Sequence, residues 1–500
     1  MANYNRTLGF GSFPTRGENI EDRIPYSAAF DGTSGYLSKD FGSAGNRRTL
    51  TWSFWINTKS LGDGSETAIQ LYGDDQNGYP SHRVSCHAGR WFCYSADDAP
   101  QSNKVEIYSE NRYFRDFTSW THIVFALDTT QATAANRLKV YVNGTNETTR
   151  WTQTIGGGQN FDTHHNSGVE AEYIGRYHTG SFFQGNLAHY HFIDGTAYDA
   201  SYFGETDTKT GEWIPITEPS VTYGSKGFFL DFADSTAMGN DVSGNNNDWT
   251  VSGTIKQSIN RPHNLFTCFN NNHSGSGQQN VITSAGTQID HANDTYTGAI
   301  TCTTLGMNSG KWYWETKYSS TGGYLCVGFV RNGGLDATKN IRENKELGDG
   351  DDANSWAFCA GNSSGQIRKK LRHNNADAVA DMGVTPAVND IIQCWLDLDN
   401  GKAWWGINGT VMNSGSGVGV PNSGTNPHFT FTVGDEFYIP AVSLYGFNGA
   451  VQCQANFGEG RFGATAVSSA VDDNGGHGSF EHNPLDGFYS ICTRNIREYG

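Results

Sequence analysis

The stretch DIIQCWLDLDNGKAWWGINGT, residues 390–410, predicts a β-strand, a turn and a second strand that ends at Asn-Gly. A shorter stretch of the same kind, NRLKVYVNGT, occupies residues 136–145. In both, bulky residues alternate up to an Asn-Gly pair, which adopts the positive φ of a tight β-turn with little strain. The chain therefore builds a similar hairpin at two distant points, within different flanking sequence.

The composition favours short strands and tight turns. The chain has 500 residues, more than one hydrophobic core usually serves, so about two or three domains are expected. It contains 62 Gly, 29 Phe, 23 Tyr and 13 Trp but only 5 Met. No long segment shows the i, i+3, i+4, i+7 apolar spacing of an amphipathic helix. We predict an all-β protein made of antiparallel β-sandwiches in series.

The formal net charge of −17 opposes nonspecific binding to nucleic acid or to an anionic membrane. The opening segment MANYNRTLGFGSFPTRGENIEDR lacks the apolar core of a signal peptide. No run of about 18 apolar residues could span a bilayer, so membrane insertion is not expected. A protein made in a cytoplasm without such a signal can still act outside the cell if lysis releases it.

Nine cysteines stand at positions 86, 93, 268, 302, 326, 359, 394, 453 and 492, and none forms a CxxC motif. This spacing argues against a zinc ribbon. Several lie inside apolar strands, where Cys behaves as a small hydrophobe. Cys86 and Cys93 could close a hairpin as a disulfide, whereas a reducing site of synthesis opposes the bond, so their pairing stays open.

Predicted strands follow one another through residues 26–205, with turn signals between them, which predicts a two-sheet sandwich. Their motifs, in chain order, are FDG and YL, then TWSFWI, SWTHIVF, LKVYVNG, YIGR and FFQGNL. This order resembles the laminin-G/concanavalin-like jelly roll. The resemblance implies that Trp120, Tyr141 and Phe183 are structural and that the VNG turn lies at the rim of the sandwich.

Residues 263–470 contain a second β region. Its motifs, in chain order, are GKWYWE, VGF, SWAF, LDLDNGKAWWGING, YIPAVS and NFG. This order resembles the SPRY domain, again a bent β-sandwich. Both Asn-Gly hairpins are thus expected inside separate sandwiches, with turns at Asn143-Gly144 and Asn408-Gly409, and they do not mark an internal repeat.

Three further segments complete the predicted layout. Residues 1–25 form an N-terminal arm that is expected to become ordered only against another subunit or virion protein. Residues 206–262 are rich in Asn, Asp, Ser and Gly and are predicted to be a polar connector. Within them, GFFLDFADSTAMGNDVSGNNNDW resembles a joint that recurs in virion proteins of tailed phages. Residues 471–500 are predicted to be a C-terminal tail.

No catalytic constellation is found, so no catalytic residue is assigned and the protein is not expected to be an enzyme. The E-x-D-x-x-E carboxylates of concanavalin-like glycosidases are missing, as are GxSxG, HExxH and P-loop motifs. The sequence HYH at 189–191 places two imidazoles on one strand face, as a metal pair would. The alternation points Tyr190 and Phe192 inward, so His189 and His191 are expected to face solvent.

Calcium is the cofactor that the laminin-G resemblance implies, although none is assigned. GDGDDAN at 348–354 offers Asp349, Asp351 and Asp352 as oxygen ligands but departs from the EF-hand pattern. YGDDQNG at 72–78 is similar. Solvated acidic loops are the simpler interpretation, so the metal ligands stay unknown. Four tryptophans outside clear strand periodicity are expected at the periphery, where rings could stack on sugars: Trp91, Trp151, Trp213 and Trp249.

Taken together, these features predict a structural component of a tailed-phage virion, assembled in the host cytoplasm and released by lysis. A tail fibre or another host-facing adhesin is the leading interpretation, as a homo-oligomer that binds a surface glycan or a neighbouring virion protein. The alternative is a decoration or scaffold protein that contacts only viral proteins. A glycan-degrading depolymerase is disfavoured by the missing carboxylates.

Overall fold

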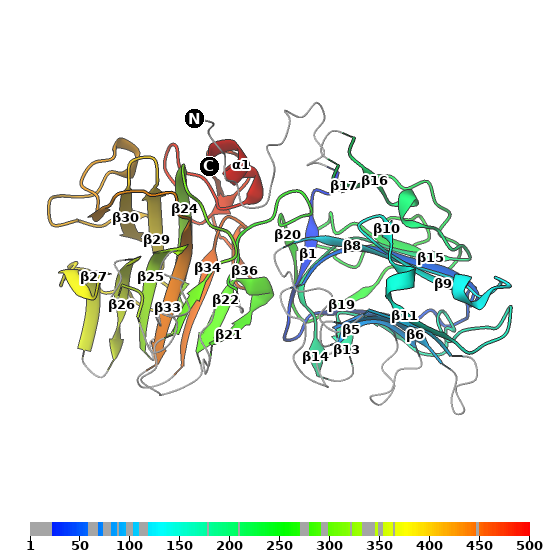
Figure 1. The fold of residues 1–500 in the computed structure, drawn as a ribbon. Coiled ribbons are helices and arrows are strands. Elements are labelled where there is room, and N and C mark those ends of the chain that lie inside the picture. The colour runs from blue at the N-terminus through cyan, green and yellow to red at the C-terminus, as the bar shows by residue number, and fades with distance from the viewer. Residues whose placement is uncertain are drawn as a thin grey trace. The chain divides into compact units, whose positions relative to one another are not determined.

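Nearly all regular structure in the chain is β, as predicted (Figure 1). This computed structural model describes residues 23–500, except for 59–68, 74–81, 88–89, 97–103, 110–118, 178–179, 209–210, 271–279, 292–298, 321–322, 333–345, 349–353, 364–365 and 447–449. The chain divides into a first unit, Met1–His263, and a second unit, Asn264–Gly500. Within the described ranges, no helix has the length and apolar character needed to cross a membrane.

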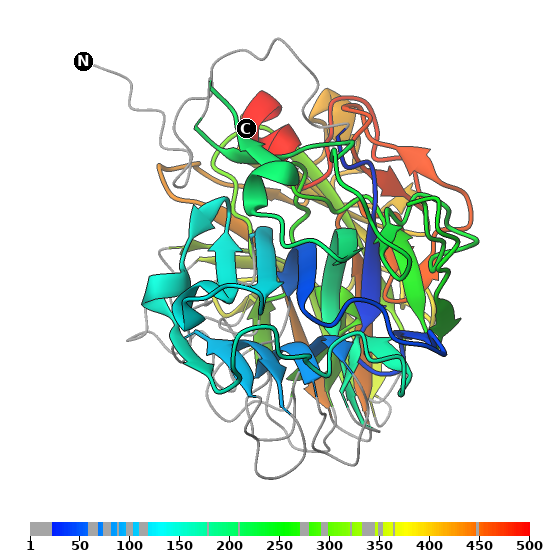
Figure 2. The ribbon, with the colours of Figure 1, turned by 90° about the vertical axis from the view of Figure 1, so that its right-hand side faces the viewer.

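The first unit is a sandwich of two antiparallel layers (Figure 1, Figure 2). One layer contains β1 (Ser27–Asp31), β3 (Thr49–Thr58), β8 (Thr121–Asp128), β9 (Leu138–Val142), β10 (Thr145–Asn146), β15 (Gln184–Asp194), β18 (Phe228–Leu230) and β20 (Ile255–Ser258). Their order is β10-β9-β8-β3-β15-β1-β20, and β18 pairs with β15.

The opposite layer of the first unit combines two smaller sheets. They contain β2 (Tyr36–Lys39), β4 (Ile69–Gly73), β5 (His82–His87), β6 (Arg90–Ser95), β7 (Val105–Tyr108), β11 (Thr152–Ile155), β12 (Glu172–Ile174) and β19 (Thr250–Ser252). The orders are β11-β7-β6-β5-β4 and β12-β2-β19, with β12 beside β4. A short hairpin, β13 (Arg176–Tyr177) and β14 (Ser181–Phe182), also lies next to β4.

The core of the first unit is aromatic. Trp52, Phe54 and Ile56 of β3 face it, as their alternation predicts, and Phe183 also belongs to it. Three tryptophans that were expected at the periphery lie in this core as well: Trp91, Trp151 and Trp249. The prediction was wrong for Trp151 and Trp249 because they lie in loops, where no periodicity marks their direction. It was wrong for Trp91 because both faces of β6 carry large side chains, so alternation does not say which face is the core.

Residues 206–262 are not a polar connector, since they complete the first sandwich. Strand β20 extends a sheet beside β1, β18 pairs with β15, and β19 pairs with β2. Phe228 and Leu230 enter the hydrophobic core. The apolar contributions come in pieces of three or four residues between long polar turns, so composition alone conceals them.

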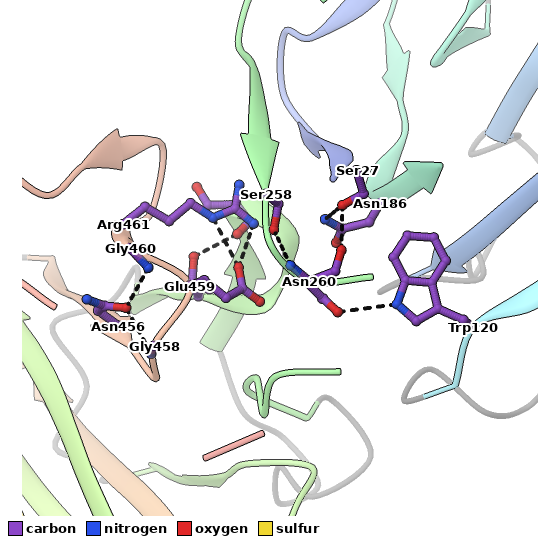
Figure 3. Close-up of polar contacts among 12 residues, drawn as sticks. Ser27, Trp120, Asn186, Ser258, Asn260, Asn456, Gly458, Glu459, Gly460 and Arg461 are labelled. Atoms are coloured by element: carbon purple, nitrogen blue, oxygen red, sulfur yellow. Dashed lines mark hydrogen bonds and ion pairs between the residues drawn. The ribbon is translucent and has the colours of Figure 1, made fainter. Parts of the chain in front are cut away.

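The end of this segment is tied into the sandwich by buried hydrogen bonds (Figure 3). The Ser27 hydroxyl donates to the Asn260 carbonyl at 2.6 Å, and Trp120 Nε1 donates to Asn260 Oδ1 at 3.2 Å. The Asn260 N–H in turn donates to Ser258 Oγ. Trp120 is therefore buried and structural, as the resemblance implied.

The second unit is also a sandwich of two antiparallel sheets. The first sheet contains β21 (Asn280–Thr283), β22 (Gln288–His291), β24 (Lys311–Tyr318), β29 (Ile391–Asp397), β30 (Lys402–Ile407), β31 (Thr410–Val411), β32 (Phe429–Thr430) and β34 (Val451–Asn456). Its order is β21-β22-β34-β24-β29-β30-β31, with β32 paired to β30.

The facing sheet of the second unit has the order β23-β33-β25-β26-β27-β28. Its strands are β23 (Ala299–Cys302), β25 (Gly323–Arg331), β26 (Ser355–Ser363), β27 (Gln366–His373), β28 (Ala376–Val379) and β33 (Tyr438–Gly446). Trp312, Trp314 and Trp405 fill the space between the sheets.

Both predicted Asn-Gly turns are confirmed. Asn143 and Gly144 have φ of 46° and 78°, and Asn408 and Gly409 have φ of 49° and 80°. Each Asn also makes the same pair of bonds to the start of a neighbouring strand. Asn143 accepts from the His122 N–H at Oδ1 and donates its N–H to the His122 carbonyl, and Asn408 does the same with Ile391.

Residues 471–500 are not a loose tail. They form β37 (Val471–Asp472), β38 (Ser479–Phe480) and α1 (Thr493–Tyr499), and Tyr489 bridges to Trp312 of β24. Phe480 and Phe488 cover the outer face of the first sheet. Since β24 and β29 carry large apolar side chains on both of their faces, an additional layer is needed to shield the outer ones from water.

Glu315 on this outer face holds the C-terminal segment in place. Its carboxylate accepts hydrogen bonds from the backbone N–H groups of Glu481 and His482 at 3.0 and 2.8 Å, and from the Tyr313 hydroxyl at 2.9 Å. Asn456, which also orders the turn at Gly458 and Gly460 (Figure 3), donates a fourth bond. Burial nevertheless raises the pKa of Glu315 to about 7.

We expect Glu315 to make the second unit more stable in mild acid. Because the folded-state pKa is raised, the contribution is fully present below the ordinary value of 4.5 and is lost as the pH rises through about 7. This shift in the pKa of Glu315 corresponds to about 3 kcal/mol in the free energy of unfolding. The advantage of the wild type over Glu315→Gln in unfolding free energy should therefore shrink between about pH 5 and about pH 8. Parallel stability profiles for the two proteins would contradict this expectation.

Candidate functional site

The histidine pair of β15 is buried, in contrast to the prediction that it faces solvent. Tyr190 and Phe192 do point into the core, but the opposite face of β15 is covered by side chains from residues 198–203 and 213–223, and Phe229 of the paired strand β18 lies beside it. The rings of His189 and His191 lie 5.7 Å apart at 87°. His191 stacks on Phe229 and hydrogen-bonds the Tyr223 hydroxyl. These contacts give the imidazoles a packing role.

The covering layer includes β16 (Gly204–Thr206) and β17 (Trp213–Pro215). Trp213 of β17 donates from Nε1 to His122 Nδ1 at 2.9 Å, and His122 Nε2 lies 2.9 Å from Ser53 Oγ. Trp213 is half-buried rather than peripheral, and Tyr141 packs nearby. The sequence of residues 198–223 shows no alternation of apolar and polar residues that would predict a layer covering the sheet.

The two acidic loops that were considered as calcium sites lie largely outside the described residues, since Asp349, Asp351, Asp352 and residues 74–78 fall in undescribed ranges. Among the described residues, one group of three potential metal ligands is found, namely Cys326, Glu346 and Cys359. Its two sulfur atoms are bonded to each other as a disulfide between β25 and β26. The group is therefore a covalent cross-link rather than a thiolate site.

Cys86 and Cys93 form no disulfide with each other, which answers the question that their spacing in the sequence raised. In the β5–β6 pair, Cys86 lies opposite Trp91 and Cys93 lies opposite Val84, so the two cysteines do not face each other. Cys93 Sγ lies 3.9 Å from His165 Nε2 inside the core. Burial raises the pKa of the Cys93 thiol and lowers that of His165, so this pair stays neutral and is a poor nucleophile.

A buried contact between a histidine and a carboxylate lies beside the Cys93–His165 pair. His82 Nε2 lies 2.9 Å from both carboxylate oxygens of Glu172, and both side chains are only 1 % exposed. The two residues link β5 to β12 across the junction of the two smaller sheets. The contact gives both buried polar groups a partner, as burial of such groups requires.

The outer face of the sheet β11-β7-β6-β5-β4 combines aromatic and cationic side chains, in the layer that holds β5 and β6 in Figure 1. In β6, Trp91, Cys93 and Ser95 point inward, whereas the half-buried residues Arg90, Phe92 and Tyr94 point outward. In β7 the outward residues are Glu106 and Tyr108. Register places Phe92 opposite Tyr108, with ring centroids 5.7 Å apart.

Three cations lie over these rings. The Arg83 guanidinium is 5.4 Å from the Phe92 centroid and 5.8 Å from that of Tyr94. Arg90 is 4.9 Å from Tyr108 and 6.0 Å from Phe92, so both arginines flank the Phe92 ring. Lys104 Nζ is 5.5 Å from Tyr94. These residues define what we call the arginine–aromatic face: Arg83, Arg90, Phe92, Tyr94, Lys104 and Tyr108.

The hairpin β13–β14 continues this surface. Arg83 donates from Nη1 to the Tyr177 hydroxyl at 3.2 Å and lies over its ring. Arg176 lies 4.2 Å from the Tyr173 centroid and 4.6 Å from that of Tyr36. A guanidinium group in this position is attracted by the electron-rich face of the ring, which holds Arg83 and Arg176 in place.

Two family models match the chain. Residues 31–200 match the model described as the Concanavalin A-like lectin/glucanases superfamily, and residues 311–460 match the SPRY domain. The chain contains a concanavalin-like domain followed by a SPRY domain. The arginine–aromatic face belongs to the concanavalin-like domain.

Solved structures similar to the chain include the SPRY domain of human HERC1 and the PSpry domain of TRIM65. The first is 16% identical, covers 37% of this chain and 96% of its own, and has a TM-score of 0.25. The second is 14% identical, covers 38% and 91% respectively, and has the same TM-score of 0.25. No curated protein matches the chain significantly.

Sequence reasoning missed the arginine–aromatic face of the concanavalin-like domain. The signal was present in RWFCYS, where Arg90, Phe92 and Tyr94 alternate with the buried Trp91 and Cys93. Because both faces of β6 carry large aromatic or apolar residues, alternation alone does not say which face is the core. The neighbouring strands β5 and β7 decide it by placing Val84 and Ile107 inward.

Proposed function

We propose that this protein is a non-enzymatic binding component of a tailed-phage virion, a tail fibre or another host-facing adhesin. In this proposal, the concanavalin-like domain binds a cell-surface glycan on its arginine–aromatic face. The observation that carries the proposal is the row of outward rings, Phe92, Tyr94 and Tyr108, on adjacent strands. Aromatic faces stack on the apolar faces of sugar rings, while arginine N–H groups donate to hydroxyls.

Support for the virion assignment comes from the sequence. Residues 227–249 resemble a joint of tailed-phage virion proteins, and the structure shows this stretch as part of the first sandwich, with Phe228 and Trp249 in its core. The resemblance thus concerns a folded element of the concanavalin-like unit. Imaging of labelled protein on particles would test this assignment, and a position on the capsid without any glycan binding would favour the decoration role instead.

The glycan proposal predicts that Phe92→Ala with Tyr108→Ala weakens binding to purified host surface glycan by about tenfold, because ring contacts contribute roughly 0.5–1.5 kcal/mol each. Tyr202→Ala is the matched control, since Tyr202 is 42% exposed in the same unit but outside the face. Affinities measured by calorimetry should change only for the double variant. Unchanged affinity in that variant, with an unaltered melting temperature, would reject this face as the site.

A further inference from the structure

We propose that the arginine–aromatic face selects polysaccharides that carry carboxylate or sulfate groups, and that Arg83 and Arg90 bind the acidic group beside Phe92. This inference rests on the proposed glycan binding and adds the chemical class of the ligand. It follows from three observations, which concern ion pairing, buried donors and the geometry of the guanidinium groups.

The first observation is that Arg83 and Arg90 form no ion pair with any carboxylate in the described part of the chain. Other arginines do so, for example Arg48 with Asp162 at 2.7 Å and Arg372 with Glu346 at 3.0 Å. The protein has 51 acidic residues against 34 Lys and Arg. In such an acidic chain, these two arginines contact aromatic rings and pair with no carboxylate of the described residues. Their positive charge is therefore available for a ligand.

The strands themselves supply little competing charge. Among the described residues of the five strands in this sheet, Glu106 is the one carboxylate, and Lys104 neutralises it at 2.8 Å. The sheet face therefore carries net positive charge at Arg83 and Arg90. An anionic group meets attraction here and no unpaired carboxylate on the same strands.

The second observation is a set of buried donors without partners. Arg83 Nε, Arg90 Nε and Ser85 Oγ are buried and make no hydrogen bond. Ser85 is fully buried, lies opposite Phe92 in the β5–β6 register, and alternates with the inward residues Val84 and Cys86. A buried donor without an acceptor is destabilising. Because these donors are enclosed, a ligand oxygen reaches the two arginine Nε atoms only if the arginine side chains shift, and it then satisfies groups that the protein leaves unsatisfied.

The third observation is geometric. A guanidinium group that lies against an aromatic ring uses its flat face for that contact and keeps its N–H groups directed outward in its plane. Those N–H groups match the paired oxygen atoms of a carboxylate or sulfate. Phe92 lies between the two arginines and can contact the apolar face of the sugar that carries the acid. The combination of anion binding and ring stacking favours an acidic polysaccharide over an isolated anion.

The inference is tested with the full chain and three purified polymers: polygalacturonate, dextran sulfate and neutral dextran. We expect Arg83→Gln with Arg90→Gln to weaken binding of the two acidic polymers at least tenfold, which is the size expected for charged hydrogen bonds. Binding of wild type to these polymers should also weaken as salt is added. Arg48→Gln with Lys256→Gln removes the same charge from exposed positions of the first unit outside the face and should leave affinity unchanged.

A second variant protects the test against misfolding. Arg83→Lys with Arg90→Lys keeps the charge and most of the side-chain packing but loses the paired donors, so an intermediate loss of affinity with a normal melting temperature is expected. Equal affinity of the glutamine variant and the wild type would overturn the inference. Displacement of the acidic polymers by single-stranded DNA at equal charge concentration would also overturn it, because simple polyanion binding would then suffice.

The outcomes also separate this inference from the proposed function. One outcome would leave the glycan proposal intact and reject selection for acid. In it, the wild type binds neutral and acidic glycans equally, and Phe92→Ala with Tyr108→Ala reduces this binding whereas the arginine changes do not. Absence of binding to host glycan and to all three polymers would reject both.

Discussion

Lowering the pH from about 7 to about 5 is expected to destabilise the concanavalin-like unit by about 2 kcal/mol for each of His122 and His189. Burial lowers the pKa of His122 to about 3 and that of His189 to about 4. The folded state therefore keeps both rings neutral, whereas the unfolded chain binds protons near the ordinary value of 6.5. The stability that they contribute is present above pH 6.5 and is lost as the pH falls towards 4 and then 3.

The contacts of His122 explain why protonation is unfavourable. Trp213 donates to its Nδ1, so the proton of the neutral ring sits on Nε2 and points to Ser53 Oγ. A second proton on Nδ1 would break the bond from Trp213, and the charge would be buried against the stacked ring of Trp55. His191 has its pKa lowered as well, by burial and by the neighbouring histidines, so several groups act in the same direction.

Thermal unfolding of the full chain across this pH range measures the effect. His189→Asn is a suitable variant, because His189 has φ of 43° at a break in the β15 register, a conformation that Asn adopts more readily than most residues. The variant should lose less stability than the wild type on acidification. If the first unit melted at the same temperature at both pH values, the histidines would not be held neutral.

Trp395→Ala is expected to lower the unfolding free energy of the SPRY-containing unit by about 3–5 kcal/mol. Trp395 is 1% exposed and packs with Tyr313, at a centroid distance of 5.1 Å, and with Phe480 and Phe488. Its Nε1 donates to the Pro484 carbonyl at 2.7 Å. Truncation leaves a cavity and an unsatisfied carbonyl at the same place, and both effects are destabilising.

The location of Trp395 also predicts which part of the second unit the substitution affects first. The ring does not fill the space between the two sheets but lies under residues 471–500 on the outer face of β29. The variant should therefore loosen the C-terminal segment first, which faster proteolysis near residue 480 would reveal. Val418→Ala, at a side chain that is 57% exposed in the same unit, should change stability by less than about 0.5 kcal/mol. A normal melting transition for Trp395→Ala would refute the packing.

Local sequence determined the elements whose geometry depends only on neighbouring residues. The all-β class, the strand of Trp52, Phe54 and Ile56, and the turns at Asn143 and Asn408 were predicted because alternation and positive φ are local properties. The order of the motifs was enough to resemble two known domains. Even so, the bond of each turn Asn to a strand start, at His122 and at Ile391, depends on the pairing of the folded strands and not on adjacent residues alone.

Tertiary structure alone decided which surfaces are covered. Residues 206–262 and 471–500 are polar on average, yet their few apolar side chains close two sandwiches, and this closure buries His189, His191 and Trp395. The same limit hid the arginine–aromatic face, since Arg83 and Phe92 meet only through strand pairing. Alternation tells which side chains share a face of a strand, but burial of that face depends on whatever distant segment packs against it.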